Sequence, residues 1–431
     1  MVNEEITFEM DDTQEPFQEG NVLTVLNLSL VTFCVLLGLS MVAPILPTYA
    51  ESFQVSYTFV GFVVSAFAVT RMVLDMPAGL LARKYDKKAI MITGLLLLST
   101  SSILAGIAPN YITLVIARMI EGSGSALYVT TATVFLAQIS GKEKRGQWMS
   151  LYMGMLLLGS IFGPTFGGIL TDIYDIRMPF FAYAIMTGLA ISPTLILPKL
   201  SNSNNSSILE SGTVLRDVKE ILSNRSFILV TFAVFTMFFL RTGVRSTLLP
   251  LFGTNNLGLT SGDIGLVLTI GGITTAITMT PMGSVSDRIG RKIPLALALV
   301  LSAIVVLVIP LLSTDFLTFA ILLGAYGAVI GFSGPSAAYI TDVSPQDKLE
   351  ISMGLYRMIS DFGFVMGPLL LGFLADLTAT QVPGEPHSGL IGFFPFLFAA
   401  LILIAAVFVL AKADDPARDL AHEKKDSTIL I

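Results

Sequence analysis

Eight ionisable side chains lie inside long apolar runs of the sequence, where a charge is costly. Each costs about 2.5–3.5 kcal/mol at the centre of a bilayer, so such residues mark candidate functional sites. A carboxylate in this setting could carry a proton, and an arginine without an acid beside it could bind an anion. In chain order, the eight are Arg71 and Asp75, Arg118 and Glu121, Arg241 and Arg245, and Arg357 and Asp361.

The runs that hold these residues have the composition of a membrane protein. Only 13% of the 431 residues are charged, 53% are hydrophobic, and the mean hydropathy is +0.78. A soluble domain carries about 25% charged residues. Runs of about 20 apolar residues without period-two alternation predict helices rather than barrel strands. We therefore predict an all-α membrane protein with twelve spans, at 21–46, 56–82, 88–108, 111–138, 146–171, 178–198, 226–251, 262–286, 292–312, 316–342, 351–376 and 388–411.

Polar segments divide the spans into two groups. The longest break, 199–225, opens with a Ser- and Asn-rich run and continues as a short amphipathic segment at 214–222. It is predicted to be a cytoplasmic linker. The predicted parts are a disordered acidic tail at 1–20, six-helix bundles at 21–198 and 226–411, the linker at 199–225 and a tail at 412–431.

The placement of Lys and Arg predicts the orientation. Five of these residues lie inside spans and Arg177 alone lies in an outer loop, which leaves 19 of the 25 on one side. Because cytoplasmic loops carry the excess of positive residues, both termini are predicted to be cytoplasmic. The first span lacks the basic start of a cleavable signal, so it should stay as part of a multi-pass protein of the cell membrane.

The two predicted bundles repeat each other at a spacing of 203–204 residues, which indicates a duplication. The matching segments are the turns Gly79–Lys88 and Gly283–Lys292, the pairs Leu46-Pro47 and Leu249-Pro250, the pairs Gly163-Pro164 and Gly367-Pro368, and Asp172 and Asp376.

The second of these turns carries the most specific motif. It reads G-S-V-S-D-R-I-G-R-K, and Gly283, Asp287, Arg288, Gly290 and Arg291 fit the inter-helix signature G-x-x-x-D-R-x-G-R-K without exception. With this signature the chain resembles, along its whole length, transporters of the major facilitator superfamily. The resemblance implies twelve helices in two pseudo-symmetric six-helix halves.

The resemblance also implies a gating role for the turns on the cytoplasmic side. Asp287 would accept hydrogen bonds from Arg288, Arg291 or a neighbouring helix end; the alternative is a basic turn that only fixes topology. The first copy keeps Gly79 but departs from the pattern, because Arg83 stands at the Asp position and Asp86 at a Gly position. Either Asp86 substitutes for the missing acid, or that side is not latched.

Two spans resemble further patterns of the family. Arg118, Gly122, Gly124 and Ala126 resemble the fourth-span pattern R-x-x-x-G-x-G-x-A. The fifth span resembles the glycine pattern of antiporters, with Ser150 in place of its leading glycine. Its glycines recur every four residues, which predicts close helix packing, and its proline predicts a bend. The residues of this pattern are Gly159, Gly163, Pro164, Gly167 and Gly168.

The spacing of the buried charges leaves two interpretations open. Each arginine–acid pair is three or four residues apart, so its members share a helix face and could neutralise each other. Alternatively, Arg118 and Glu121 form a proton-coupling pair, with Asp361 as a second site. Arg241 needs Asp361, Glu121 or an anionic ligand, whereas Arg245 could extend to the outer surface.

Three functions follow from these observations. The first is a secondary transporter that works by alternating access and exports small organic molecules or drugs in exchange for protons. The second is a carrier for an organic anion or metabolite, because the spans hold five arginines and three acids. The third, a membrane sensor or scaffold, would need a soluble domain that the sequence lacks.

Other classes find no support in the sequence. It shows no nucleophile–base constellation and no phosphate-binding loop, so we expect neither an enzyme nor a nucleic-acid partner. Cys34 is the only cysteine, which excludes an intramolecular disulfide and a cysteine metal site. We expect a monomer in the lipid bilayer, without metal or cofactor, whose partners are a small-molecule substrate and protons.

Overall fold

The computed structural model describes residues 22–140, 145–199, 211–382 and 385–418. Twelve helical spans in these ranges are long and apolar enough to cross a membrane, which confirms the predicted all-α fold. In chain order the spans are α1 (Val22–Val42), α3 (Tyr57–Lys84), α4 (Lys87–Gly106), α5 (Tyr111–Ile139), α6 (Arg145–Ile173), α7 with α8 (Met178–Leu189, Ile191–Ile196), α10 with η1 and α11 (Arg225–Leu240, Arg241–Leu248, Leu249–Asn255), α12 (Ser261–Ile289), α13 (Lys292–Leu312), α14 with α15 (Phe316–Gly331, Ser336–Val343), α16 (Leu349–Thr378) and α17 (Phe394–Ala411).

Short elements connect some of these spans. The first span stops at Val42 and, after a turn, the chain continues as the short helix α2 (Leu46–Glu51). The twelfth span begins at Phe394 and not at the predicted 388, because the preceding residues form an antiparallel hairpin of β1 (Thr380–Val382) and β2 (Glu385–Leu390). The 3-10 turn η2 (Gln346–Lys348) precedes α16.

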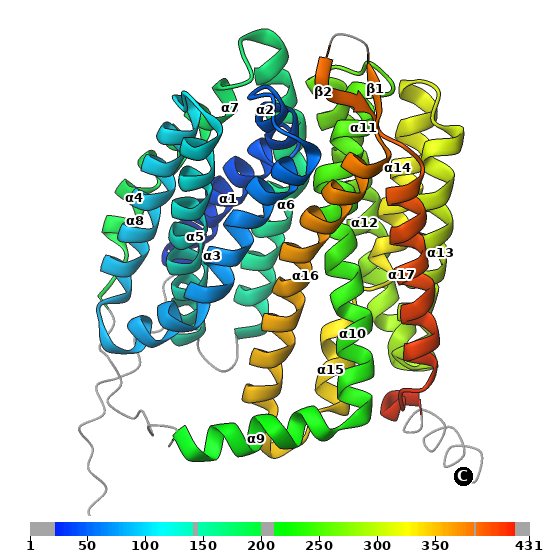
Figure 1. Cartoon of the computed structure of the whole chain (residues 1–431). Coiled ribbons are helices and arrows are strands. Elements are labelled where there is room, and N and C mark those ends of the chain that lie inside the picture. Colours follow the sequence, from blue (N-terminus) through cyan, green and yellow to red (C-terminus); the bar gives the residue numbers. More distant parts are fainter. Residues whose placement is uncertain (1–21, 141–144, 200–210, 383–384, 419–431) are drawn as a thin grey trace, which may run out of the picture.

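The spans form two groups that lie side by side (Figure 1). We call α1–α8 the first half and α10–α17 the second half. The halves meet mainly along two helix pairs, α3 with α16 and α6 with α12, which we call the α3–α16 seam and the α6–α12 seam. Since these helices form the boundary between the halves, the contacts of their residues depend on the relative position of the two halves.

The helix α9 (Ser211–Ser223) lies across one end of the bundle, opposite the β1–β2 hairpin (Figure 1). We call these ends the α9 face and the hairpin face. Lys348 Nζ lies 2.5 Å from Glu220 Oε2 and 3.5 Å from Asp217 Oδ1. The Lys348 ammonium lowers the pKa of Glu220, and Glu220 raises the pKa of Lys348. With Ile221 buried, these contacts dock α9 on the second half.

Candidate functional site

The charges of α3 and α16 pair across the seam and not within each helix. Arg71 Nη2 lies 2.6 Å from Asp361 Oδ1, and Arg357 Nη2 lies 3.7 Å from Asp75 Oδ2. Of the interpretations that the spacing left open, neutralisation between sequence neighbours is therefore wrong for these two pairs. The helices are antiparallel neighbours, so the order Arg, Asp along one meets the order Asp, Arg along the other. The result is two ion pairs that join the halves.

The two crossed pairs differ in burial. Asp361 is 4% exposed and its partner Arg71 is only partly exposed, whereas the side chain of Arg357 is 55% exposed. The guanidinium of Arg71 also lies 5.5 Å from the centroid of the Phe364 ring. Asp75 accepts a further hydrogen bond from Thr130 Oγ1 at 3.0 Å. The pair of Arg71 and Asp361 is thus the more strongly desolvated of the two connections.

The third predicted pair stays within one helix. Arg118 Nη1 donates to Glu121 Oε2 inside α5, and both side chains are buried. The guanidinium of Arg118 lies 4.9 Å from the centroid of the Phe67 ring on α3. Glu121 Oε1 has no hydrogen-bond partner in the described part of the chain. This acid is therefore buried next to the seam without joining the two halves.

A cavity of about 580 Å³ lies at the α6–α12 seam. Its walls come from α1 and α6 of the first half and from η1, α12 and α14 of the second half. Four of its lining residues are Met153, Leu157, Thr275 and Met279. These positions are the repeat counterparts, at a spacing of 204, of the four charged residues of the α3–α16 seam. One seam is thus closed by ion pairs where the other is open and mostly apolar.

Two arginines of the seventh span line this cavity. Arg245 Nη2 donates to the carbonyl oxygen of Leu268 on α12 at 3.0 Å. The expectation that Arg245 extends to the outer surface is therefore wrong. Arg241 is exposed at the cavity and forms no ion pair with the described residues, since Asp361 and Glu121 have other partners.

The glycines of the fifth span pack against two different helices. A Cβ added to Gly159, Gly163 or Gly167 would lie 2.1–2.8 Å from an atom of α1. A Cβ on Gly168 would instead lie 2.3 Å from the carbonyl oxygen of Ser261, at the start of α12. The predicted close approach therefore serves both the first half and the seam. Pro164 lies in the same helix, and its carbonyl oxygen faces Gly265 of α12.

Sequence reasoning missed the second copy of this glycine pattern. Gly363, Gly367 and Gly372 lie 204 residues after Gly159, Gly163 and Gly168. The first two pack on the seventh span, and a Cβ on Gly372 would lie 2.3 Å from the carbonyl oxygen of Tyr57, at the start of α3. The signal was present in the spacing, because Gly367 belongs to a Gly-Pro pair that the repeat had already matched.

Two aspartates connect the halves at the hairpin face. Asp376 Oδ1 accepts from the backbone nitrogen of Tyr57 at 2.7 Å, and Asp376 Oδ2 accepts from that of Thr58 at 2.8 Å. Its repeat counterpart Asp172 accepts from the backbone nitrogen of Gly262 at 2.8 Å. Each carboxylate thus caps the first turn of a helix from the other half, where the backbone N–H groups lack partners.

Hydroxyl groups continue both seams towards the middle of the spans. Ser65 Oγ donates to the carbonyl oxygen of Val365 at 2.6 Å across the α3–α16 seam. Thr269 Oγ1, at the equivalent position, donates to the carbonyl oxygen of Ile161 at 2.9 Å across the α6–α12 seam. The hairpin side of both seams is therefore closed by the same set of repeat-related contacts.

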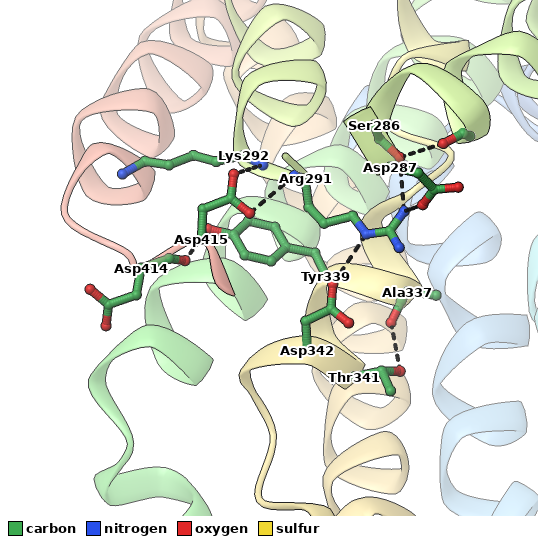
Figure 2. Close-up of polar contacts among 11 residues, drawn as sticks. Ser286, Asp287, Arg291, Lys292, Ala337, Tyr339, Thr341, Asp342, Asp414 and Asp415 are labelled. Carbon is green, nitrogen blue, oxygen red and sulfur yellow. Dashed lines mark hydrogen bonds and ion pairs between the residues drawn. The ribbon is translucent and has the colours of Figure 1, made fainter. Parts of the chain in front are cut away.

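The signature turn of the second half forms a polar cluster at the α9 face (Figure 2). Arg291 Nη1 lies 2.5 Å from Asp287 Oδ1, and its Nε lies 3.1 Å from Asp342 Oδ2 on α15. Asp415 accepts hydrogen bonds from the backbone nitrogens of Arg291 and Lys292, both at 3.1 Å. These contacts tie α12 to α15 and to the end of α17, all within the second half.

Backbone geometry explains why residue 290, directly before Arg291, is a glycine. Gly290 ends α12 with φ of +95°, a conformation that side chains rarely allow. A Cβ there would also lie 2.2 Å from Asp415 Oδ2. Arg288 forms no ion pair with any residue that the structure describes, and Asp287 is 61% exposed on its side chain.

The first-half turn is built differently. Asp86 caps α4 by accepting a hydrogen bond from the backbone nitrogen of Lys88 at 3.0 Å, and the Cβ position of Gly79 faces Thr130. The side chain of Arg83 lies outside the described residues. The lysines at the turn ends remain equivalent: Lys88 Nζ donates to carbonyl oxygens at the end of α8, and Lys292 Nζ does so at the end of α17.

Comparisons with known proteins agree with this architecture. Multidrug resistance protein 1 of Bacillus subtilis (strain 168) is 29% identical over 391 residues, which cover 89% of this chain and 94% of the relative. Quinolone resistance protein NorA of Staphylococcus aureus (strain COL) is 25% identical over 353 residues, which cover 80% of this chain and 88% of the relative.

The fold has relatives among solved structures as well. The nucleoside transporter NupG matches with a TM-score of 0.74 at 13% identity, covering 90% of this chain and 98% of that one. At this identity the likeness concerns the fold alone. The sequence profile of the Major Facilitator Superfamily matches residues 28–260 and 234–430. With its twelve apolar spans, the chain therefore belongs to the major facilitator superfamily and is a multi-pass membrane transporter, not an enzyme.

Proposed function

We propose that this transporter exports small organic molecules, drugs among them, in exchange for protons, by alternating access. The names of the relatives, multidrug and quinolone resistance proteins, support export of drugs. The observation that carries the proton coupling is the ion pair of Arg71 and Asp361. It places a buried, titratable carboxylate where its charge holds the two halves together.

The coupling step follows from the chemistry of this pair. A proton on Asp361 removes the negative charge that Arg71 faces, so the attraction across the α3–α16 seam falls. Breaking a buried ion pair on one side costs about 3–5 kcal/mol, enough to shift an equilibrium between two arrangements of the halves. Substrate in the cavity and a proton on Asp361 then favour different arrangements, which is the requirement for exchange.

Glu121 has a secondary role in this scheme. Its ion pair with Arg118 lies within α5, so a proton on Glu121 does not act directly on the contact between the halves. The motif resemblance made this pair the first candidate for proton coupling. The geometry favours Asp361 as the primary coupling residue. Glu121, buried in α5 next to the α3–α16 seam, would have only a secondary part in proton transfer.

Proton movement in proteoliposomes tests the proposed function. Purified protein is reconstituted with a pH-sensitive dye inside the vesicles, and cationic, neutral and anionic compounds are added in turn. We expect a transported compound to drive proton movement in the opposite direction. Transport of a radiolabelled compound that stays unchanged when the proton gradient is collapsed would reject the exchange of protons.

We also propose that the α9 face is cytoplasmic and that residues 21–198 and 226–411 act as two rocking units joined by the linker 199–225. One chain supplies both seams and the whole cavity, which supports a working monomer. Most of the two tails, 1–20 and 412–431, lies outside the described residues.

Cysteine labelling tests this orientation in the cell membrane. After Cys34→Ser removes the single native thiol, Lys219→Cys on α9 and Thr314→Cys at the other end report the two faces. In intact cells a membrane-impermeant maleimide should label Thr314→Cys only. Permeabilised cells should label both variants. Labelling of Lys219→Cys alone in intact cells would invert the proposed topology.

A further inference from the structure

We propose that the cavity binds an organic carboxylate, with its anionic group held between Arg241 and Arg245 and its apolar body along α6 and α12. This inference rests on the proposed transport function and adds the chemical class of the ligand. Three features of the structure carry it: the local backbone, the charge balance of the cavity and the chemistry of its walls.

The backbone around the two arginines is a π-helix with one inserted residue. Gly159 packs on the carbonyl oxygen of Phe33, and its repeat counterpart Gly363 packs on that of Phe235, a spacing of 202 between the first and seventh spans. The Leu-Pro pairs at the ends of these spans correspond at 203. The seventh span therefore holds one more residue than the first, and it is accommodated in η1.

The insertion shapes the site. At the end of η1, the backbone nitrogen of Leu249 donates to the carbonyl oxygen of Val244, five residues earlier instead of four. Such wide turns are rare and recur at functional sites. The widened turn keeps Arg241 and Arg245, four residues apart, on the same cavity wall. Across the cavity, Ala43 and Pro44 lie at the break between α1 and α2, so the break in the first span faces the widened turn of the seventh span.

The charge of the cavity is uncompensated. Its described lining contains two arginines and no acidic residue. Arg245 uses one of its N–H donors for the carbonyl oxygen of Leu268. Arg241 donates to no side chain or carbonyl that the structure describes. A guanidinium has five donors in a planar fork that suits a carboxylate. An anion that enters from water would therefore find two positive charges and most of their donors unused.

The remaining walls favour an apolar body on the ligand. Met153 and Leu157 on α6 and Met279 on α12 give the cavity apolar surface. Of the four hydroxyl residues in the lining, three donate to backbone carbonyl oxygens: Ser160, Ser246 and Thr275. Methionine side chains adapt to ligands of different shape. The same positions carry Arg and Asp at the other seam, so this seam lacks those charges and presents an adaptable, apolar surface. A flat aromatic body with one carboxylate matches both parts of the cavity.

Binding of three matched probes tests the proposal on full-length protein in nanodiscs. The probes are the anion 2-naphthoate, its neutral amide 2-naphthamide, and the cation 2-naphthylmethylammonium. Hydrogen bonds to a charged group predict a preference of about tenfold to a hundredfold for 2-naphthoate over 2-naphthamide. Equal affinity for acid and amide, or tighter binding of the ammonium, overturns the proposal with wild-type protein alone.

Variants then locate the site. Arg241→Ala should reduce the affinity for 2-naphthoate about tenfold or more and leave 2-naphthamide unchanged, and Arg241→Lys should restore part of it. Arg216→Ala, an exposed arginine on α9, is the matched control and should bind all probes as wild type. If Arg241→Ala with Arg245→Ala keeps the full preference for the acid, the arginines are not the site.

The outcome is separable from that of the proposed function. Proton exchange driven only by cationic compounds would keep the transporter proposal and reject the carboxylate site. Binding of 2-naphthoate that depends on Arg241, without any proton movement, would keep the site and reject proton coupling.

Discussion

Asp361→Asn is expected to abolish proton-coupled exchange in proteoliposomes while substrate binding in the cavity persists. Asparagine has nearly the shape of aspartate but cannot take up a proton in the physiological range. Asp361 does not line the cavity, so binding itself should remain. Because a neutral asparagine mimics the protonated acid, which favours the arrangement without substrate, the affinity for a bound compound should fall and should no longer depend on the protonation of residue 361. The measurement is dye-reported proton release beside a binding isotherm for the same compound.

A stability comparison separates coupling from folding. Asp361→Asn leaves Arg71 largely buried without its counter-charge, which we expect to lower the free energy of unfolding by about 3–5 kcal/mol at most. Adding Arg71→Gln removes the orphaned charge, so the double variant should recover part of this loss in a thermal melt. Neither variant should regain proton exchange, because both lack the titratable group.

Glu121→Gln is the matched control for this prediction. It removes a buried carboxylate from α5 but leaves the ion pair across the α3–α16 seam in place. Exchange should therefore be weakened and not lost. If Glu121→Gln abolishes proton exchange while Asp361→Asn exchanges normally, the coupling role returns to Glu121.

The sequence predicted the membrane fold because the evidence for it is repeated along the whole chain. Apolar length locates each span within a few residues, and the repeated Leu-Pro and Gly-Pro pairs align the halves. The hairpin escaped detection because its strands have three and six residues, and Pro383 and Pro386 interrupt any alternation in the sequence. Here the strands pair because the end of α16 and the start of α17 bring them together.

The partners of the charged residues could not be predicted from spacing. An arginine four residues before an aspartate can bond along its own helix or to a neighbour, and the choice depends on how α3 and α16 align. The alignment places Arg71 beside Asp361 and leaves Asp75 for Arg357. If the two halves had the same residues at equivalent positions, both seams would carry these charges. The positions on α6 and α12 that correspond to the four charged residues are instead mostly apolar.

The π-helix could not be predicted from the sequence of the seventh span alone. Arg241 and Arg245 are spaced like many surface arginines, and no pattern within the seventh span indicates an inserted residue. The insertion becomes visible only when the glycines of α6 and α16 fix the register of the first and seventh spans. The direction of Arg245 follows from that register, which explains why its predicted route to the outer surface was wrong.

Gly61→Ala is expected to stop transport by keeping the hairpin face from closing. A Cβ on Gly61 would lie 2.1 Å from the carbonyl oxygen of Pro368, and one on Gly265 would lie 2.2 Å from that of Pro164. The obstacle in each case is backbone, which cannot rotate away, so the seam must widen. Overpacking of this kind costs about 1–3 kcal/mol, and we expect the transport rate to fall about tenfold or more.

Gly354→Ala on α16 is the control, because no atom lies within 4 Å of its added Cβ. It should transport as wild type and be slightly more stable, since alanine favours a helix over glycine. The hydrogen bonds of Asp376 to α3 should weaken only in Gly61→Ala, and faster hydrogen exchange at the backbone amides of Tyr57 and Thr58 would report this. Normal transport by both Gly61→Ala and Gly265→Ala would mean that the cycle does not need the close contact of the seams, and the hairpin-face bonds would then be a packing feature rather than a gate.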